Sequence, residues 1–275
     1  MELCNFDRYM QGLWKSGISP LEIFSERTYQ KAEYQENIAP FIAEVAELEE
    51  QTKQYRVSYA QEFEKATQTV VRTEYGTGSI YLSMGFYHPD PVVELVTINV
   101  KRGRILKKIT EKSKPSHIYG FNEKNQLVTV EMPADPEIGI QHKEVILNQG
   151  DQIWCLSYDE RSGQTDLSTI EQFVFRQGRL CKRSKAVLYD PKKLTDVEIS
   201  TFSYSEKGID ERTRTQIMLS GSLYQCTPCV FRSAERFVHD EQGVVSGFWC
   251  SWDEGRPIAD VPKITVIPAA RRKKV

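Results

Sequence analysis

The chain has 275 residues, 40% of them hydrophobic, which is enough to bury one large core or two modest ones. The 36 Lys and Arg residues, against 38 Asp and Glu, give a net charge of -2, so no overall field attracts nucleic acid or an anionic membrane. The sequence also lacks a bilayer-spanning apolar run and the apolar region of a signal peptide. We therefore expect a cytoplasmic protein with reduced cysteines, no membrane contact and no nucleic-acid partner.

The N-terminal segment, residues 1–74, carries the signals of helices. Ser19 caps a helix start, so we expect a helix over about residues 20–35. A second helix begins near Asn37, because apolar side chains then recur at steps of three or four: Ile38, Phe41, Ile42, Val45 and Leu48. Residues 53–73 continue this stripe, but part of them also alternates as a strand would, so helix and strand both stay open there.

From about residue 75 the apolar residues recur with a period of two, which indicates strands. Ile80, Leu82 and Met84 predict the first of them. Similar strand–turn–strand segments, most with a Gly or Asn in the turn, then follow at 98–105, 119–127, 156–163, 173–180, 202–209 and 237–244. A single hairpin is only marginally stable, so we expect these segments to pack together.

The predicted fold class is therefore α+β, mainly β. A helical N-terminal segment precedes a meandering antiparallel sheet or open barrel of repeated hairpins over residues 75–268. Residues 269–275 form a basic tail, which we expect to be disordered.

The segments at 156–163 and 173–180 resemble the YD repeats of Rhs-type proteins. The first contains Tyr158 and Asp159 in succession, and the second has the order aromatic-x-aromatic-polar-x-Gly-Arg-Leu. The likeness is confined to one turn and its flanking residues in each copy, and most copies lack the Tyr-Asp pair. It implies a small β-meander protein related to bacterial toxin–immunity systems, with another protein, such as a toxin, as partner.

Cys226 and Cys229 form a Cys-x-x-Cys pair near the C-terminus. Together with Cys250 and His239 they supply four ligands of the kind that Zn²⁺ accepts in tetrahedral sites, so zinc is the one cofactor to consider. The pair also fits a thiol site, or two turn cysteines without a metal. A thioredoxin-like site is disfavoured, because too few residues follow Cys229 to complete that domain.

Trp249 and Trp252 lie on opposite faces of one predicted strand, so both are buried only if the strand is covered on each side. One of them is therefore a candidate partner-binding residue, with an ordinary core position as the alternative. No motif in the sequence predicts a catalytic residue, so an enzyme is unsupported.

The function that we expect is a non-enzymatic protein-binding protein, in its sharpest form an immunity-type neutraliser of a bacterial toxin. Two alternatives stay open. One is a zinc- or thiol-dependent enzyme or regulator that uses the cysteine cluster. The other is a structural subunit that oligomerises through the long helix at Tyr55, Tyr59 and Phe63.

Overall fold

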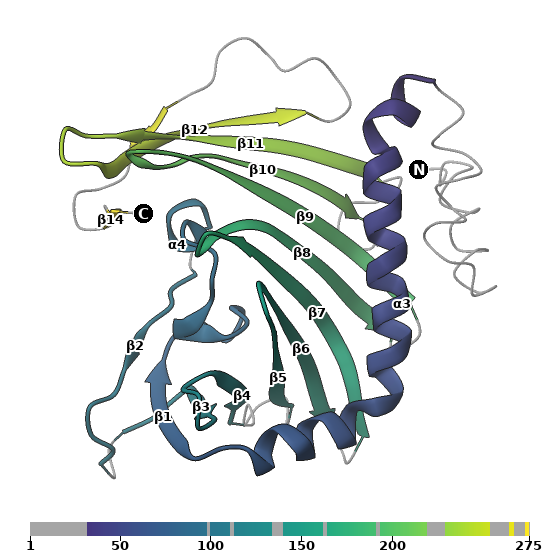
Figure 1. Ribbon diagram of the computed structural model, residues 1–275, viewed down its shortest axis with the longest axis vertical. Coiled ribbons are helices and arrows are strands. Elements are labelled where there is room, and N and C mark those ends of the chain that lie inside the picture. The colour runs from purple at the N-terminus through teal and green to yellow at the C-terminus, as the bar shows by residue number, and fades with distance from the viewer. Residues whose placement is uncertain are drawn as a thin grey trace, which may run out of the picture.

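The computed structural model describes residues 32–97, 100–110, 113–133, 140–161, 164–190, 193–218, 229–253, 264–266 and 273–274. These residues form one 14-stranded antiparallel sheet and a long helix (Figure 1). From β3 to β13, strands that follow one another in the chain are neighbours in the sheet, and β2 and β13 are its two ends. The architecture confirms the mainly β meander, and the described sheet does not close into a barrel.

The strands are β1 Arg72–Thr77, β2 Arg104–Ile105, β3 His117–Phe121, β4 Leu127–Met132, β5 Gln141–Gln149, β6 Gln152–Arg161, β7 Gln164–Arg176, β8 Arg179–Asp190, β9 Lys193–Ser205, β10 Gly208–Met218, β11 Cys229–His239, β12 Val244–Asp253, β13 Ile264–Val266 and β14 Lys273–Lys274. The helices are α3 Ala32–Gln68, the 3-10 helix η2 Gly85–Tyr87 and α4 Val93–Val96. The structure describes no helix that is long and apolar enough to cross a membrane. β14 pairs with β12, so two residues of the tail that was expected to be disordered lie in the sheet.

The long helix α3 continues to Gln68, through most of residues 53–73, where the sequence was compatible with both a helix and a strand. Residues 53–68 are helical, so the strand alternative is wrong for them, and β1 begins shortly afterwards. The helix predicted over 20–35 lies outside the described residues except for 32–35, which belong to α3. Tyr55 and Tyr59, one helical turn apart, both pack against the sheet in one hydrophobic cluster. The ring centroids of Tyr59 and Tyr158 lie 4.0 Å apart, and the Tyr158 hydroxyl donates to the backbone carbonyl of Tyr55 at 3.3 Å.

At β6 both faces of the sheet are covered, because successive side chains of this strand pack into two different hydrophobic clusters. Leu156 packs with Val45 and Leu48 of α3 in one hydrophobic cluster, whereas its neighbour Cys155 packs in a second cluster with Val92. Successive side chains of a strand point to opposite faces, so α3 lies on one face and Val92 on the other. We call the α3 side the outer face and the other side the inner face.

The predicted strand–turn–strand segments are mostly hairpins. Those at 119–127, 156–163, 173–180, 202–209 and 237–244 join β3 to β4, β6 to β7, β7 to β8, β9 to β10 and β11 to β12. Among the turn residues, Asn125 and Gly178 have φ of 57° and 75°, the left-handed conformation that the sequence pattern requires. The described part of 98–105 is no hairpin: Ile105 and Arg104 pair instead with β1.

Residues 79–97, here called the strap, are not a strand, which corrects the prediction for Ile80, Leu82 and Met84. Met84 and Gly85 have left-handed φ of 57° and 47°, so the alternation ends in a tight turn and η2 follows. The strap then crosses the inner face, where Val92 and Leu95 pack into the second hydrophobic cluster. Its side chains bind polar groups of the sheet, and these long-range contacts override the local alternation.

Two glycines with nearly the same backbone angle differ in their surroundings. Gly103 and Gly178 have φ of 76° and 75°. A Cβ on Gly103 would meet the Thr77 carbonyl oxygen at 1.5 Å, whereas a Cβ on Gly178 would meet nothing within 4 Å. Gly103 therefore allows the chain that follows the strap to pass close to the end of β1, whereas Gly178 is required only by the conformation of its turn.

We predict that Gly178→Ala costs about 1–2 kcal/mol of unfolding free energy, from the left-handed backbone alone. Gly103→Ala should cost clearly more, because the same strain is joined by a backbone clash. Urea unfolding of both variants measures the difference. Equal losses would contradict the close packing of Gly103 against β1.

Candidate functional site

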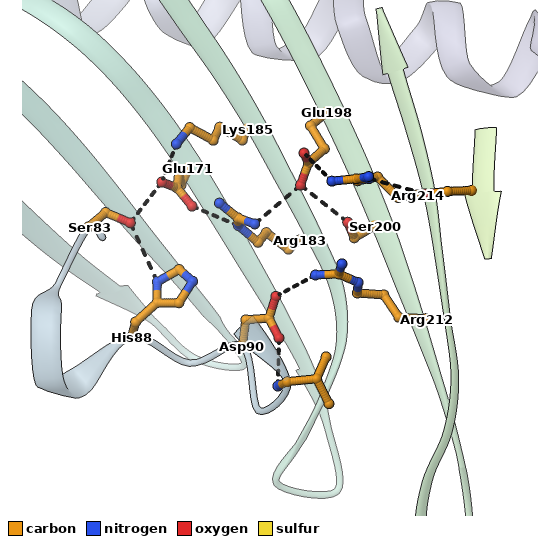
Figure 2. A network of polar contacts seen from close by, with 12 residues as sticks. Ser83, His88, Asp90, Glu171, Arg183, Lys185, Glu198, Ser200, Arg212 and Arg214 are labelled. Atoms are coloured by element: carbon orange, nitrogen blue, oxygen red, sulfur yellow. Dashed lines mark hydrogen bonds and ion pairs between the residues drawn. The ribbon is translucent and has the colours of Figure 1, made fainter. Parts of the chain in front are cut away.

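Charged side chains cross the inner face of the sheet beneath the strap. Cross-strand register places Glu171 opposite Lys185, Lys185 opposite Glu198, and Arg212 opposite Glu235. Directly opposed residues point to the same face, so these charges form a band across β7 to β11. We call it the charged belt: Glu171, Arg183, Lys185, Glu198, Arg212, Arg214 and Glu235. Figure 2 shows most of the belt with the strap residues that it binds, in front of the strands and with α3 behind them.

Arg212 joins the strap to the sheet. Its Nε and Nη2 each donate to Glu235 at 3.0 Å, and its Nη1 donates to Asp90 of the strap at 3.2 Å. The second oxygen of Asp90 accepts the N–H of Val92 at 2.9 Å, and Arg102 donates to the carbonyl of Asp90. The Asp90 side chain is 0% exposed, and its two carboxylate oxygens have Arg212 and the Val92 N–H as donors in place of water.

Glu171 forms the second anchor. It accepts the hydroxyl of Ser83 at 2.7 Å and Nε of Arg183 at 2.8 Å, and Lys185 Nζ lies 3.4 Å from it. Burial alone would raise the pKa of Glu171, but Arg183 and Lys185 hold it well below its usual range. Nδ1 of His88 lies 3.4 Å from the Ser83 hydroxyl, and burial lowers the pKa of His88, so this ring is neutral.

Glu144 forms the third anchor, on β5. Its Oε2 accepts the backbone N–H of Met84 at 2.7 Å, and its Oε1 lies 3.7 Å from Nε2 of His142. His142 also binds Asp159 through Nδ1. Burial alone would lower the pKa of His142, but the hydrogen bonds to Asp159 and Glu144 raise it to about 9, so the imidazole is charged at neutral pH.

Two clefts lie beside the strap. The β5–β8 cleft has a volume of about 430 Å³, and its polar lining includes Ser83, His142, Glu144, Asp159, Thr169 and Lys185. The β8–β10 cleft has a volume of about 310 Å³, and its charged lining is Arg183, Lys185, Asp196, Glu198, Arg212 and Arg214. Tyr81, Lys185 and Val187 line both clefts, so Tyr81 stands between them.

The turn that carries Tyr81 exposes apolar side chains although its base is buried. Tyr81 is 84% exposed, Ile80 48% and Phe86 38%, whereas Met84 between them is 3% exposed. The Phe86 N–H donates to the Tyr119 hydroxyl at 2.9 Å, in addition to the contacts of Ser83 and Met84 with the sheet. The exposed side chains are therefore held on a turn whose polar groups bind the core.

The groups at this site are poorly suited to acid–base or nucleophilic chemistry. Ser83 donates to a carboxylate whose lowered pKa makes it a weak base, and His88 is only 1% exposed. Burial raises the pKa of the Cys155 thiol, which keeps it protonated. His142 is already protonated at neutral pH, so it cannot accept a proton there. None of these four side chains is therefore an accessible base or an ionised nucleophile.

Three of the four residues predicted to bind zinc lie along β11 and β12: Cys229, His239 and Cys250. Register places Cys229 opposite Met218, Cys250 opposite Glu235 and His239 opposite Val245. Cys229 and Glu235 are six residues apart in β11, about 20 Å at the rise of an extended strand, so Cys229 and Cys250 are not brought together.

Cys226 lies outside the described residues, and zinc binding by the Cys226–Cys229 pair stays a prediction. Among the described residues, no group of three or more His, Cys, Asp and Glu side chains could hold a metal ion.

Trp249 and Trp252 both lie in β12, opposite Arg236 and Ser233 respectively. Their role in partner binding stays a prediction.

Neither the strap nor the charged belt was predicted from the sequence. The signal that the sequence holds for them is the presence of charges at inward positions of otherwise alternating strands, such as Arg183 in β8 and Arg212 in β10. Such charges look like solvent-facing positions until the strap is known to cover them.

Comparison with known proteins places no further constraint on this site: no protein-family model, no curated protein and no solved structure matches the chain.

We predict that Arg212→Met lowers the free energy of unfolding by about 3–5 kcal/mol, because Asp90 and Glu235 lose their buried partner. The matched control is Arg236→Met. Arg236 pairs with Glu211 but its side chain is 76% exposed, so the cost should stay below about 1 kcal/mol. Urea unfolding of both variants gives the comparison, and similar losses would argue against the belt as the anchor of the strap.

The raised pKa of His142 makes stability depend on pH in a defined direction. The charged form is favoured in the folded state, so its contribution is complete below pH 6.5 and disappears as the pH rises through about 9. Between pH 6.5 and 9.5 the free energy of unfolding of the wild-type protein should fall by up to roughly 3 kcal/mol more than that of the His142→Gln variant. If the free energies of unfolding of wild type and His142→Gln changed with pH in parallel, the result would contradict a charged His142 in the folded protein.

Proposed function

We propose that this chain is a non-enzymatic protein-binding protein whose interface centres on Tyr81. The observation that carries the proposal is the turn at residues 80–86, which exposes Ile80, Tyr81 and Phe86 from a base bound to the sheet. Aromatic anchors presented on a preorganised element lose little conformational freedom on binding, and such residues dominate protein interfaces.

The shape of the site favours a protein over a small molecule. Tyr81 is 84% exposed and stands between the two clefts instead of lining a closed cavity. A small ligand in either cleft would leave much of this ring in water, whereas a protein with a complementary pocket can cover it. The pairing of the nearby ionisable groups supports a stoichiometric complex without turnover.

An immunity-type neutraliser of a bacterial toxin is the specific form of this proposal. Its support is the resemblance of the hairpins at 156–163 and 173–180 to YD repeats of Rhs-type proteins. In this form one copy of the chain binds one toxin molecule and abolishes its activity.

The proposal predicts a partner within covalent reach of position 81. Tyr81 is replaced by photoreactive benzoylphenylalanine, and the protein is irradiated in the cells from which its gene comes. One discrete cross-linked product of higher mass is expected, identified by mass spectrometry. Ile109, 48% exposed and outside the strap, is the matched control position and should give no such product.

Absence of a product at position 81, or equal products at both positions, would contradict the proposal. A product that contains only two copies of this chain would show self-association instead of binding to a different protein.

A further inference from the structure

We propose that the basic arm, residues 101–110 with Ser113 and Lys114, binds the anionic headgroups of a lipid bilayer as a peripheral contact. The inference goes beyond the proposed function and does not depend on it. The expectation of no membrane contact came from the net charge of -2, which averages the whole chain. Residues 101–114 hold seven Lys and Arg and one acid, Glu111, a net charge of +6, so the local field differs in sign from the overall one.

The positive charge of the arm is exposed and is not neutralised by the described part of the fold. Five of its cations are exposed and have no ion-pair partner among the described residues: Lys101, Arg104, Lys107, Lys108 and Lys114. In this they differ from the cations of the charged belt, such as Arg183 and Arg212, each of which binds a buried carboxylate.

The acids of the neighbouring segments are not available to balance the arm. Each acid of β1 and of the strap already has an arginine partner: Glu74 pairs with Arg72, Asp90 with Arg212 and Glu94 with Arg102. Arg72 and Arg102 are not among the five unpaired cations. An anion that approaches the arm therefore meets charges that no carboxylate of β1 or the strap has taken up.

The arm is attached to the rest of the fold at both ends, and its middle is exposed. The Arg102 guanidinium donates to two carbonyl groups of the strap. The N–H groups of Leu106 and Ser116 donate to carbonyl groups of β1 at 2.8 Å and 2.9 Å. Residues 107–110, between these attachments, are all exposed. β2 is an end of the sheet and lies at the margin of the molecule (Figure 1), so a large surface can reach these side chains.

Protection of the sheet edge does not account for these charges. A charged residue on an edge strand prevents pairing with another sheet, and Arg104 of β2 serves that purpose. β2 ends at Ile105, however, so Lys107, Lys108 and Lys114 lie beyond the strand. Their presence calls for another reason, which binding to an anionic surface supplies.

The composition of the arm favours a lipid surface over a nucleic acid. Four of the five unpaired cations are lysines, whose compact charge suits a diffuse anionic field, whereas the fork of arginine suits individual phosphates. Residues 101–114 contain no Phe, Tyr or Trp on which a base could stack. The arm instead exposes Ile109, 48% in water, directly after two lysines. At a bilayer this side chain reaches the acyl boundary while the ammonium groups stay among the headgroups.

The test is sedimentation of the purified chain with vesicles of phosphatidylcholine, alone or with about 30% phosphatidylserine, at about 0.1 M salt. We expect binding to the anionic vesicles only, with a partition coefficient that falls as salt is raised. Each cation near the headgroups contributes about fivefold. Lys107→Gln combined with Lys108→Gln should therefore lower the coefficient by about 25-fold. Ile109→Ser alone should lower it by about twofold to fivefold, since less apolar surface is buried.

The matched control combines Lys53→Gln with Lys207→Gln, which removes the same charge from α3 and from the β9–β10 turn. Both lysines are exposed. The partition coefficient should change by less than about twofold, because charges farther than a Debye length from the contact are screened. Thermal melting of every variant separates lost binding from lost folding. Arg104→Gln with Lys114→Gln is the second test pair if the first is unstable.

Equal binding to neutral vesicles, no binding to anionic ones, or equal losses in the test and control variants would overturn the inference. A short DNA duplex that displaces the chain from the vesicles and depends on the same lysines would also overturn it, in favour of a nucleic-acid surface. The cross-link at position 81 tests the proposed function separately. A lipid adduct at position 109 adds only the mass of one lipid, so Ile109 stays a valid control in that experiment.

Discussion

The contact between Asp90 of the strap and Arg212 of β10 is the interaction on which the arrangement of the site depends. Both groups are almost fully buried, and an unpaired charge at either position would be costly. Because Arg212 is already held by Glu235, the position of Asp90 is determined by the sheet. The strap can therefore lie on the inner face in one register, which is the kind of specificity that buried ion pairs provide at some expense of stability.

This register decides where the exposed turn lies. Ser83 and Met84 bind Glu171 and Glu144, which stand on β7 and β5, so the turn is attached across several strands at once. A turn attached in this way cannot collapse onto the sheet to bury Tyr81. Exposure of an aromatic side chain is unfavourable in the free protein, and the anchors of the turn maintain it, which is why we read Tyr81 as an interface residue.

The parts of the fold that the sequence predicted are those specified by local signals. Gly178 follows an aromatic alternating stretch at 173–175, and the β7–β8 hairpin needs only that short segment to be recognised. The secondary structure at Tyr55 and Tyr59 was ambiguous in the sequence, because a step of four residues fits both the period of a helix and that of a strand. The helix is stabilised by packing of Tyr59 against Tyr158, a residue of a strand far away in the chain.

The site could not be predicted in the same way, because its contacts join positions far apart in the chain. Ile80, Leu82 and Met84 carry the local pattern of a strand, yet Met84 is left-handed because its N–H must reach Glu144 in β5. The same argument bears on binding. The apolar part of the inner face is buried by Val92 and Leu95, whereas the charged part beside Tyr81 stays open as two clefts. Charged walls are stable in water, so the free protein need not cover them. A protein that covered these clefts in the proposed complex would have to replace that water with polar groups of its own, so the clefts, more than the aromatic ring, would determine its specificity.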